Sequence, residues 1–361
     1  MIIVVGGGIA GLSLGWRLAM AGAEITVLEA DKIGSGASYA AASYLEPRLG
    51  KGAMRALEWA SVKAWPDFAH ELEAISGQSL DYRTDGQIRI AYKENLEKVK
   101  ADAEQRDTEG WRVDWLEDDA LRALEPHLSD EVLGAAFLPD VHWLDGRRLC
   151  RALGLAIEKT GGRVHEHSPV EALITIGGNV RGVMVNDEQL TADRVIIAAG
   201  MGANNIASLP ADIPRCRPVK GVMLGLAMDV ENPIVRRLIK RPDGILCPRS
   251  DGRLLVGVTH EEGETSRTAS DAAIQKLMRS ATRAVPAIAG LELIEAAYGI
   301  RSFVGDGLLR LGHSAEIEGL YYSLSHAGAG FIRAPAISAE LASFVLDRNA
   351  DCPHIGPFLK R

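Results

Sequence analysis

The chain has 361 residues, 47% of them hydrophobic and 24% charged, and it carries a net charge of −8. This composition is ordinary for a globular protein, and the length is sufficient for two lobes around a large core. The acidic balance disfavours a nucleic-acid-binding protein, which needs a basic face. We therefore expect no nucleic-acid partner.

The sequence predicts neither a metal site nor a membrane protein. Its four cysteines are scattered without a CxxC pair, which disfavours a zinc site or a redox dithiol. No apolar run reaches the ~20 residues of a membrane span. Residues 1–5 read as a strand, and no basic segment of a signal peptide precedes them. We expect a cytoplasmic protein with reduced cysteines.

The first thirty residues, MIIVVGGGIAGLSLGWRLAMAGAEITVLEA, read as a strand–helix–strand unit. Residues 2–5 form a short apolar run, which is typical of a buried parallel strand. A helix is expected over residues 9–20 and a second apolar strand over residues 25–28. The glycine-rich turn between the first strand and the helix is the position of a dinucleotide-binding loop.

The glycines of this turn fit the GxGxxG pattern. Gly6 permits the tight turn, Gly8 lets the backbone approach a pyrophosphate, and Gly11 lets the helix pack closely on the strand. Ile9 and Ala10 open the helix, whose free N–H groups and partial positive charge favour phosphate. The sequence therefore predicts a dinucleotide site, with a glycine-rich structural turn as the alternative.

The second strand ends in an acidic residue. Glu29, followed by Ala30, is placed to accept hydrogen bonds from the adenosine ribose, and its charge disfavours a 2′-phosphate. The fingerprint alone does not separate NAD from FAD. Residues 34–45, GSGASYAAASYL, are mostly small, so backbone there is able to pass close to an extended ligand. A small-residue helix packed on the sheet is the alternative reading of this segment.

Segments along nearly the whole chain resemble the D-amino-acid oxidase superfamily of FAD-dependent amine oxidoreductases, and glycine oxidase in particular. Residues 300–307, IRSFVGDG, are nearer to the D-arginine and D-amino-acid dehydrogenase branch. The other segments, in order, are GSGASYAAASYL, DVHW at 140–143, HSPV at 167–170, VIIAAG at 195–200, PVKG at 218–221, PRSDGRLLVGV at 248–258 and SHAGAGFIRAP at 325–335.

The resemblance implies an α/β fold in which a Rossmann-like FAD-binding domain is interleaved with a mixed-sheet, α+β substrate-binding domain. The FAD-binding domain is expected from residues 1–80, 145–214 and 304–361, and the substrate-binding domain from residues 81–144 and 215–303. The hydrophobic pattern predicts helices over 53–76, 94–106, 147–160 and 272–285 and after Gly330, strands over 87–92 and 320–325, and a hairpin turn at Asp251–Gly252.

The resemblance also assigns residues to the cofactor, which is expected to be FAD bound non-covalently. Val170 matches a valine over the adenine, and Gly200 ends an apolar strand. The final glycine loop is expected near the flavin ring, where the positive end of the following helix favours negative charge. The other residues assigned in this way are Ala37, Ser38, Ala42 and Ser43 in the small-residue segment, and Gly328, Ala329, Gly330, Phe331 and Ile332 in the loop.

Arg301 is the first candidate for the chemistry. It lies in an apolar strand, AAYGIRSFV, where an unpaired charge is costly and an anionic partner is needed. The guanidinium fork matches a carboxylate with two parallel hydrogen bonds. The matching arginine of the family clamps the substrate carboxylate, and an internal salt bridge between lobes is the alternative.

The chain departs from glycine oxidase at three positions in the expected pocket. Gly328 replaces an arginine, Ile245 replaces a tyrosine, and Ala42–Ser43–Tyr44 replaces Ala-Gly-Met. Tyr44 thus becomes a candidate catalytic residue. A substrate larger or less polar than glycine, or a secondary amine, becomes plausible.

Other candidates have structural alternatives. His326 is a candidate catalytic residue near the flavin, although a lone histidine at a strand end is commonly structural. Glu46 and Arg48 either reach the pocket or form a surface ion pair.

The sequence therefore predicts an FAD-dependent oxidoreductase that oxidises the C–N bond of an amino acid or related amine. Hydride transfer to flavin N5 gives an imine, which water converts to a keto acid, and electrons pass to oxygen or a carrier. A flavoprotein subunit of a multi-subunit dehydrogenase, an NAD-dependent dehydrogenase and a flavin hydroxylase are the alternatives. The substrate's chirality, a homo-oligomer and partner subunits stay open.

Overall fold

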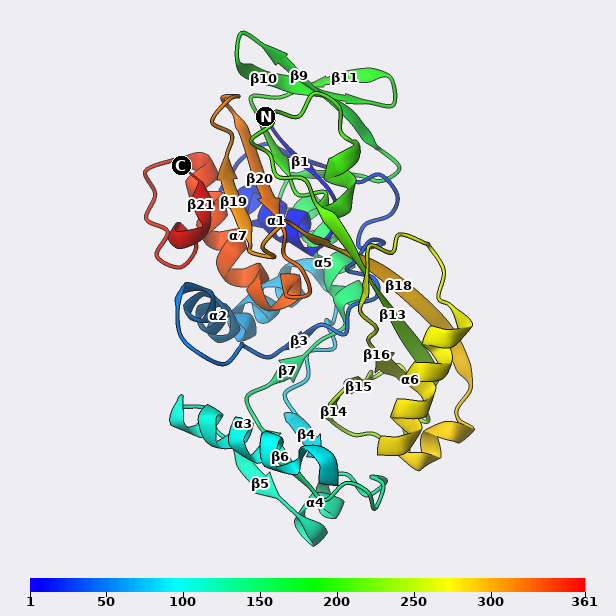
Figure 1. Ribbon diagram of the computed structural model, residues 1–361. Helices are drawn as coiled ribbons and strands as arrows, with labels where there is room; N and C mark the ends of the chain where they lie inside the picture. The colour runs from blue at the N-terminus through cyan, green and yellow to red at the C-terminus, as the bar shows by residue number, and fades with distance from the viewer. Residues whose placement is uncertain (361) are drawn as a thin grey trace.

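A seven-stranded sheet forms one half of the computed structural model, which describes residues 1–360 (Figure 1). Its central strands are fully buried apolar runs, IIVV and ITVL, as expected for parallel strands covered on both faces. The strand order is β21 (Leu359–Lys360), β19 (Arg310–His313), β20 (Leu320–Leu324), β12 (Arg194–Ile197), β1 (Ile2–Val5), β2 (Ile25–Leu28) and β8 (Arg163–His165). From β20 to β8 every pairing is parallel.

Helices cover one face of this sheet, and a small sheet covers the other. The helices are α1 (Ile9–Met20), α2 (Ala53–Ser76), α5 (Gly146–Lys159) and α7 (Gly330–Leu346). The small antiparallel sheet contains β9 (Val170–Ile176), β10 (Asn179–Val185) and β11 (Glu188–Thr191), and η2 (Gly200–Asn205) lies beside it. The sheet is therefore the centre of a three-layer arrangement.

A nine-stranded mixed sheet forms the other half (Figure 1). Its order is β17 (Glu261–Glu262), β13 (Arg217–Ala227), β16 (Arg253–Gly257), β15 (Gly244–Pro248), β14 (Leu238–Arg241), β4 (Gln87–Ala91), β6 (Gly134–Leu138) and β5 (Asp114–Leu116), and β18 (Leu293–Phe303) pairs with β13. One face packs on α6 (Asp271–Ala284) and η3 (Pro286–Gly290). The remaining elements of this half are η1 (Lys93–Asn95), α3 (Leu96–Thr108) and α4 (Asp118–Leu124).

A short ribbon of β3 (Tyr44–Leu45) and β7 (His142–Trp143) lies between the two large sheets (Figure 1). It adjoins an apolar cluster on the second face of the nine-stranded sheet, which includes Ala40, Ala42 and Trp143 together with Met223 and Ile245. The small-residue segment before Tyr44 is thus packed against that face. The last described turn, η4 (Gly356–Phe358), lies beside β19.

The α/β fold class and the predicted elements are confirmed. The helices over 9–20 and 53–76 have the predicted bounds, and the predicted helix over 94–106 is split into η1 and α3, which ends at Thr108. The Asp251–Gly252 turn joins β15 to β16 as an antiparallel hairpin. The division into an FAD-binding and a substrate-binding domain stays a prediction. No helix within residues 1–360 is long and apolar enough to cross a membrane.

A buried ion pair joins α2 to α7. Glu58 accepts from Arg333 Nη2 at 2.7 Å, and the two side chains are 3% and 4% exposed. Glu58 also accepts from the half-exposed Arg48. Burial raises the pKa of Glu58, but Arg48 and Arg333 outweigh it and bring the pKa below its ordinary 4.5. Arg48 therefore pairs with Glu58 and not with Glu46.

Replacing Glu58 with Gln is expected to lower the free energy of unfolding by about 3 kcal/mol, because Arg333 is left buried without a counterion. The matched control is Glu71→Gln. Glu71 lies on the same helix as Glu58, is partly exposed and pairs with Arg17 of α1, and its replacement is expected to cost less than about 1 kcal/mol. Urea unfolding of the holoprotein measures both. Equal effects of the two variants would contradict the prediction. The contribution of Glu58 is present above pH 4.5 and is lost as the pH falls through the lower folded pKa.

Candidate active site

The carboxyl ends of the parallel strands bring the glycine-rich turns together. Gly6 follows β1, Glu29 follows β2 and Gly200 follows β12. Gly6 N donates to Leu28 O and Ala198 N donates to Val5 O, both at 2.8 Å. Because β2 and β12 lie on opposite sides of β1, the strand order reverses there. Open α/β sheets bind ligands at such a crevice.

The backbone of the GxGxxG turn is packed too closely at Gly6 and Gly11 to admit a side chain. Gly6 has φ +113°, and a Cβ there would lie 2.6 Å from the Ala198 carbonyl oxygen. A Cβ on Gly11 would overlap the Gly6 carbonyl oxygen. Gly8 differs, because its Cβ would meet only Ser38 Oγ, at 3.5 Å. The space beside Gly8 therefore suits a close backbone approach by a pyrophosphate.

Two helix N-termini adjoin this space. A Cβ on Gly330, the first residue of α7, would lie 3.1 Å from Ile9 Cγ2, at the start of α1. Neither helix has a capping side chain on its N-cap residue or an acidic residue in its first turn. Ser38 Oγ accepts from Ile9 N at 3.1 Å. The remaining N–H groups and the two helix dipoles suit an anionic ligand, and the residues present therefore fit the pyrophosphate of FAD.

Glu29 is held at the edge of the same turn. Its carboxylate accepts from Gly7 N at 2.7 Å and from Asp31 N at 3.0 Å, which leaves acceptor capacity for ribose hydroxyls. Ser168 N donates to the Glu29 carbonyl at 2.7 Å. Val170, two residues further on, therefore begins β9 beside the end of β2, while Ala30 is exposed.

The small-residue segment fits between the two sheets. A Cβ on Gly299 of β18 would lie 3.2 Å from Ala37 Cα and from Ala40 Cβ. Arg249 Nη2 donates to the Ala42 carbonyl at 2.7 Å. Larger side chains would separate the segment from β18. This close packing accounts for the small residues, and the role of Ala37, Ser38, Ala42 and Ser43 toward the cofactor stays a prediction.

The final glycine loop places its residues in two environments. Gly328 is exposed, and Ala329 and Gly330 are partly buried. Phe331 and Ile332 have side chains 6% and 4% exposed, and both pack in the core of the helical layer. Only the backbone of these two residues is therefore available to a ligand.

Arg301 lies beside this loop. A Cβ on Gly328 would lie 3.8 Å from Arg301 Cδ, and a Cβ on Gly221 would overlap the guanidinium. Arg301 Nη2 donates to the Thr259 carbonyl at 3.2 Å, and no carboxylate of residues 1–360 forms an ion pair with it. Burial lowers the pKa of Arg301, and the nearby Tyr44 opposes this shift. The predicted alternative, a salt bridge between lobes, is absent from the part of the chain described.

Tyr44 faces a second cation. Lys240 Nζ on β14 donates to Tyr44 Oη at 3.0 Å and lies 5.1 Å from the ring centroid. The sequence did not single out Lys240. Its signal was a charged residue after two apolar residues, Leu238 and Ile239, in a short strand. Glu46 reaches the same region, where it pairs with Arg106 at 2.7 Å.

His326 is neutral in this arrangement. Its Nε2 pairs with Ser323 Oγ at 2.9 Å, and its Nδ1 is buried without a partner in the described residues. Burial, with a smaller contribution from Arg333, lowers the pKa of His326 to about 3. The side chain therefore carries no charge near pH 7, and a role as a proton donor there is disfavoured.

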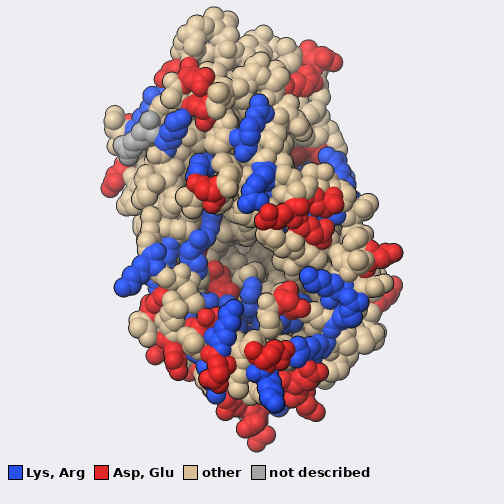
Figure 2. Space-filling model, viewed as in Figure 1, with Lys and Arg blue, Asp and Glu red and all other residues tan. Residues whose placement is uncertain are grey.

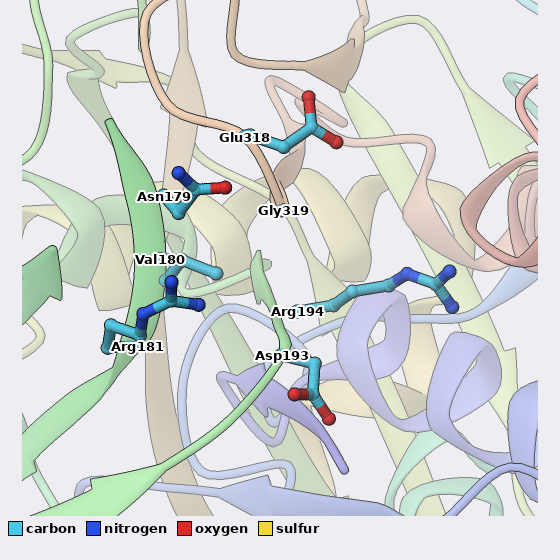
Figure 3. A pocket seen from close by; sticks show the side chains of 7 residues that line it. All are labelled: Asn179, Val180, Arg181, Asp193, Arg194, Glu318 and Gly319. Atoms are coloured by element: carbon cyan, nitrogen blue, oxygen red, sulfur yellow. The ribbon is translucent and has the colours of Figure 1, made fainter. Parts of the chain in front are cut away.

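The face shown in Figure 2 is hollowed between the two halves of the molecule, with basic and acidic side chains along the lower edge. A different hollow, of about 260 Å³, lies among Asn179, Val180, Arg181, Asp193, Arg194, Glu318 and Gly319 (Figure 3). It adjoins the amino ends of β12 and β20, opposite the glycine turns. Ligands of open α/β sheets bind at the carboxyl ends, so this second hollow is not the predicted site.

The fold and the crevice are those of a dinucleotide-binding α/β protein, with the second sheet packed against the small-residue segment. The chain belongs to the family of FAD-dependent oxidoreductases, whose family model matches residues 1–344. It is 29% identical to a glycine oxidase of Bacillus licheniformis over 347 residues, which cover 95% of this chain and 92% of that protein.

Two further comparisons agree with this assignment. The chain is 28% identical, over 97% of its length, to the bifunctional protein ThiO/ThiG of Nostoc sp., of which it spans only 53%. The crystal structure of glycine oxidase from Bacillus cereus superimposes with a TM-score of 0.92, at 23% identity, covering 100% of this chain and 98% of that one. The predicted superfamily, FAD as the cofactor and oxidoreductase activity are confirmed.

Replacing Gly8 with Ala is expected to weaken FAD binding about tenfold or more, because the new methyl group occupies the space beside the turn. The backbone at Gly8 has φ −82°, so alanine is unstrained and folding is preserved. Gly290→Ala, at an open position in η3, is the matched control. Flavin fluorescence during dialysis measures how much FAD each variant retains. Equal retention by both variants would remove Gly8 from the site.

Proposed function

We propose that this protein oxidises the C–N bond of an amino acid or a related amine. The observation that carries the proposal is Arg301, a largely buried guanidinium without an acidic partner in residues 1–360, beside Gly328 of the final glycine loop. A buried cation of this kind requires an anion, and a substrate carboxylate supplies one. The similarity to glycine oxidases supports a substrate of this class.

In this proposal Arg301 binds the substrate carboxylate through two hydrogen bonds and thereby orients the Cα–H bond. FAD supplies the hydride acceptor. The N–H groups at the start of α7 stabilise negative charge that develops beside them. The amine reacts in its neutral form. Loss of hydride from its Cα leaves an iminium, which water hydrolyses to a keto acid and ammonia or an amine. We assign FAD to residues 1–80, 145–214 and 304–361, and substrate binding to residues 81–144 and 215–303.

The pocket supports a substrate other than glycine. Ile245 is buried at 2% exposure in the apolar cluster on the second face of the nine-stranded sheet, and Gly328 adds no side chain to the loop. Tyr44 adds a ring and a hydroxyl. These three differences from glycine oxidase support a substrate with a substituted Cα.

Anaerobic absorbance of the holoprotein against a panel of amines tests the activity. The panel contains glycine, sarcosine, proline, and acidic, basic and neutral D- and L-amino acids. We expect at least one member to bleach the oxidised-flavin band. Readmission of air then separates an oxidase from a dehydrogenase that uses a carrier. A flavin that no amine bleaches would overturn the proposal and favour a subunit that works only with partner chains.

Replacing Arg301 with Met is expected to lower kcat/KM for the bleaching substrate by about a hundredfold or more, because the carboxylate loses a bidentate, charge-assisted partner. Flavin content is expected to stay unchanged. Arg217→Met, an arginine on the neighbouring β13 that is 43% exposed and paired with Glu262, is the control. Equal rates for the two variants would exclude Arg301 as the carboxylate clamp.

A further inference from the structure

The face of the nine-stranded sheet that meets the small-residue segment is apolar in its middle and carries cations on either side. Arg89, Lys240 and Ile245 are direct cross-strand partners, so their side chains share one face. The same row continues through Gly257 and Met223 to Ala297. Arg301 lies four residues after Ala297 on the same strand and therefore on the same face. Cations thus occupy two places on this face. Arg301 lies on β18, and Lys240 and Arg89 lie side by side on β14 and β4.

The charges around Tyr44 do not balance. Glu46 is 7% exposed and forms ion pairs with both Arg89 and Arg106. Lys240 is partly buried and forms no ion pair within residues 1–360. Glu46 thus forms ion pairs with two of these three cations, and Asp102 and Glu109 also act on Arg106, which leaves Lys240 without an ion pair in the described residues. Burial raises the pKa of Glu46, but Arg89, Arg106 and Lys240 outweigh it and bring the pKa below its ordinary value.

Several nitrogen atoms of these cations also have no hydrogen-bond partner among the described residues. Nε and Nη1 of Arg106 are buried and unpartnered, as is Nε of Arg89. Lys240 has one neutral partner, Tyr44 Oη, although an ammonium has three donors. A partly buried ammonium without an ion-pair partner is unfavourable, and a ligand anion beside Lys240 relieves it.

Tyr44 connects this cluster to Arg301. Its hydroxyl accepts from Lys240, and its ring packs on the apolar row of Ile245, Met223 and Ala297 that leads across this face to the strand of Arg301. A ligand beside Tyr44 therefore has a guanidinium toward one end and an ammonium toward the other. The arrangement is that of a site for two separated anionic groups.

We propose that Lys240 and Tyr44 form a second carboxylate subsite, so that the preferred substrates are amino acids whose side chain ends in a carboxylate. This inference rests on the proposed amine oxidation, in which Arg301 takes the α-carboxylate. Lys240 binds the side-chain carboxylate directly, and Tyr44 Oη donates to it. Glu46 holds Arg89 and Arg106 in place and limits the positive charge.

Ligand binding to the resting holoenzyme tests the subsite without turnover. Perturbation of the flavin spectrum by glutarate is compared with that by butanoate, which has one carboxylate fewer. We expect glutarate to bind about tenfold more tightly or better, because a hydrogen bond between charged groups contributes that much. Lys240→Met is expected to abolish the difference, and Lys240→Arg to retain most of it. The control is Lys276→Met. Lys276 is an exposed residue of α6, which packs on the opposite face of the nine-stranded sheet.

Turnover gives the second measurement. The ratio of kcat/KM for glutamate over glutamine, and for aspartate over asparagine, is expected to exceed about ten for the reactive enantiomer and to fall toward one in Lys240→Met. Flavin content verifies that the variant folds. Equal binding of glutarate and butanoate by the unmodified protein, or a ratio that Lys240→Met leaves unchanged, would overturn the subsite.

Different outcomes contradict the proposed amine oxidation and the proposed carboxylate subsite. If no amine bleaches the flavin while glutarate still binds through Lys240, amine oxidation is wrong and the subsite stands. If neutral amino acids bleach the flavin and the acidic ones have no advantage, amine oxidation stands and the subsite is wrong.

Discussion

The close backbone contacts of Gly6 with Ala198 and of Gly11 with the Gly6 carbonyl are the constraint on which the rest of the structure depends. With no Cβ at either glycine, α1 begins directly over the end of β1, and its first N–H groups face the crevice. The start of α7 then lies against Ile9, so two helix dipoles converge on one space. A single side chain at these positions would separate the elements that build the cofactor site.

The second constraint is electrostatic. The nine-stranded sheet packs one face on α6 through an apolar cluster and turns the other, with Arg89, Lys240 and Arg301, toward the cofactor side. Buried cations without full compensation destabilise a fold by several kcal/mol each. The apolar clusters offset this cost, and strain of this kind commonly marks a functional site.

Local signals in the sequence predict much of the fold. The βαβ unit, the long helix over 53–76 and the hairpin at Asp251–Gly252 follow from short-range hydrophobic pattern and turn chemistry. Pairings across long sequence separations do not, because no local pattern encodes them. Lys240 meets Tyr44 across 196 residues and Arg333 meets Glu58 across 275. For the same reason Arg301 was identifiable as a charge in an apolar strand, while the absence of an acidic partner within residues 1–360 was visible only in the folded chain.

The adjacency of Ile9 and Gly330 has a consequence for biosynthesis. β1 is flanked by β12, and α1 packs on α7, so the amino-terminal unit finds its neighbours only after most of the chain exists. A nascent chain that has not reached Gly330 lacks one wall of the nucleotide crevice. Contacts this distant in sequence form slowly, and the incomplete unit exposes apolar strand and helix surface until α7 is in place. The nucleotide crevice is therefore completed late in folding.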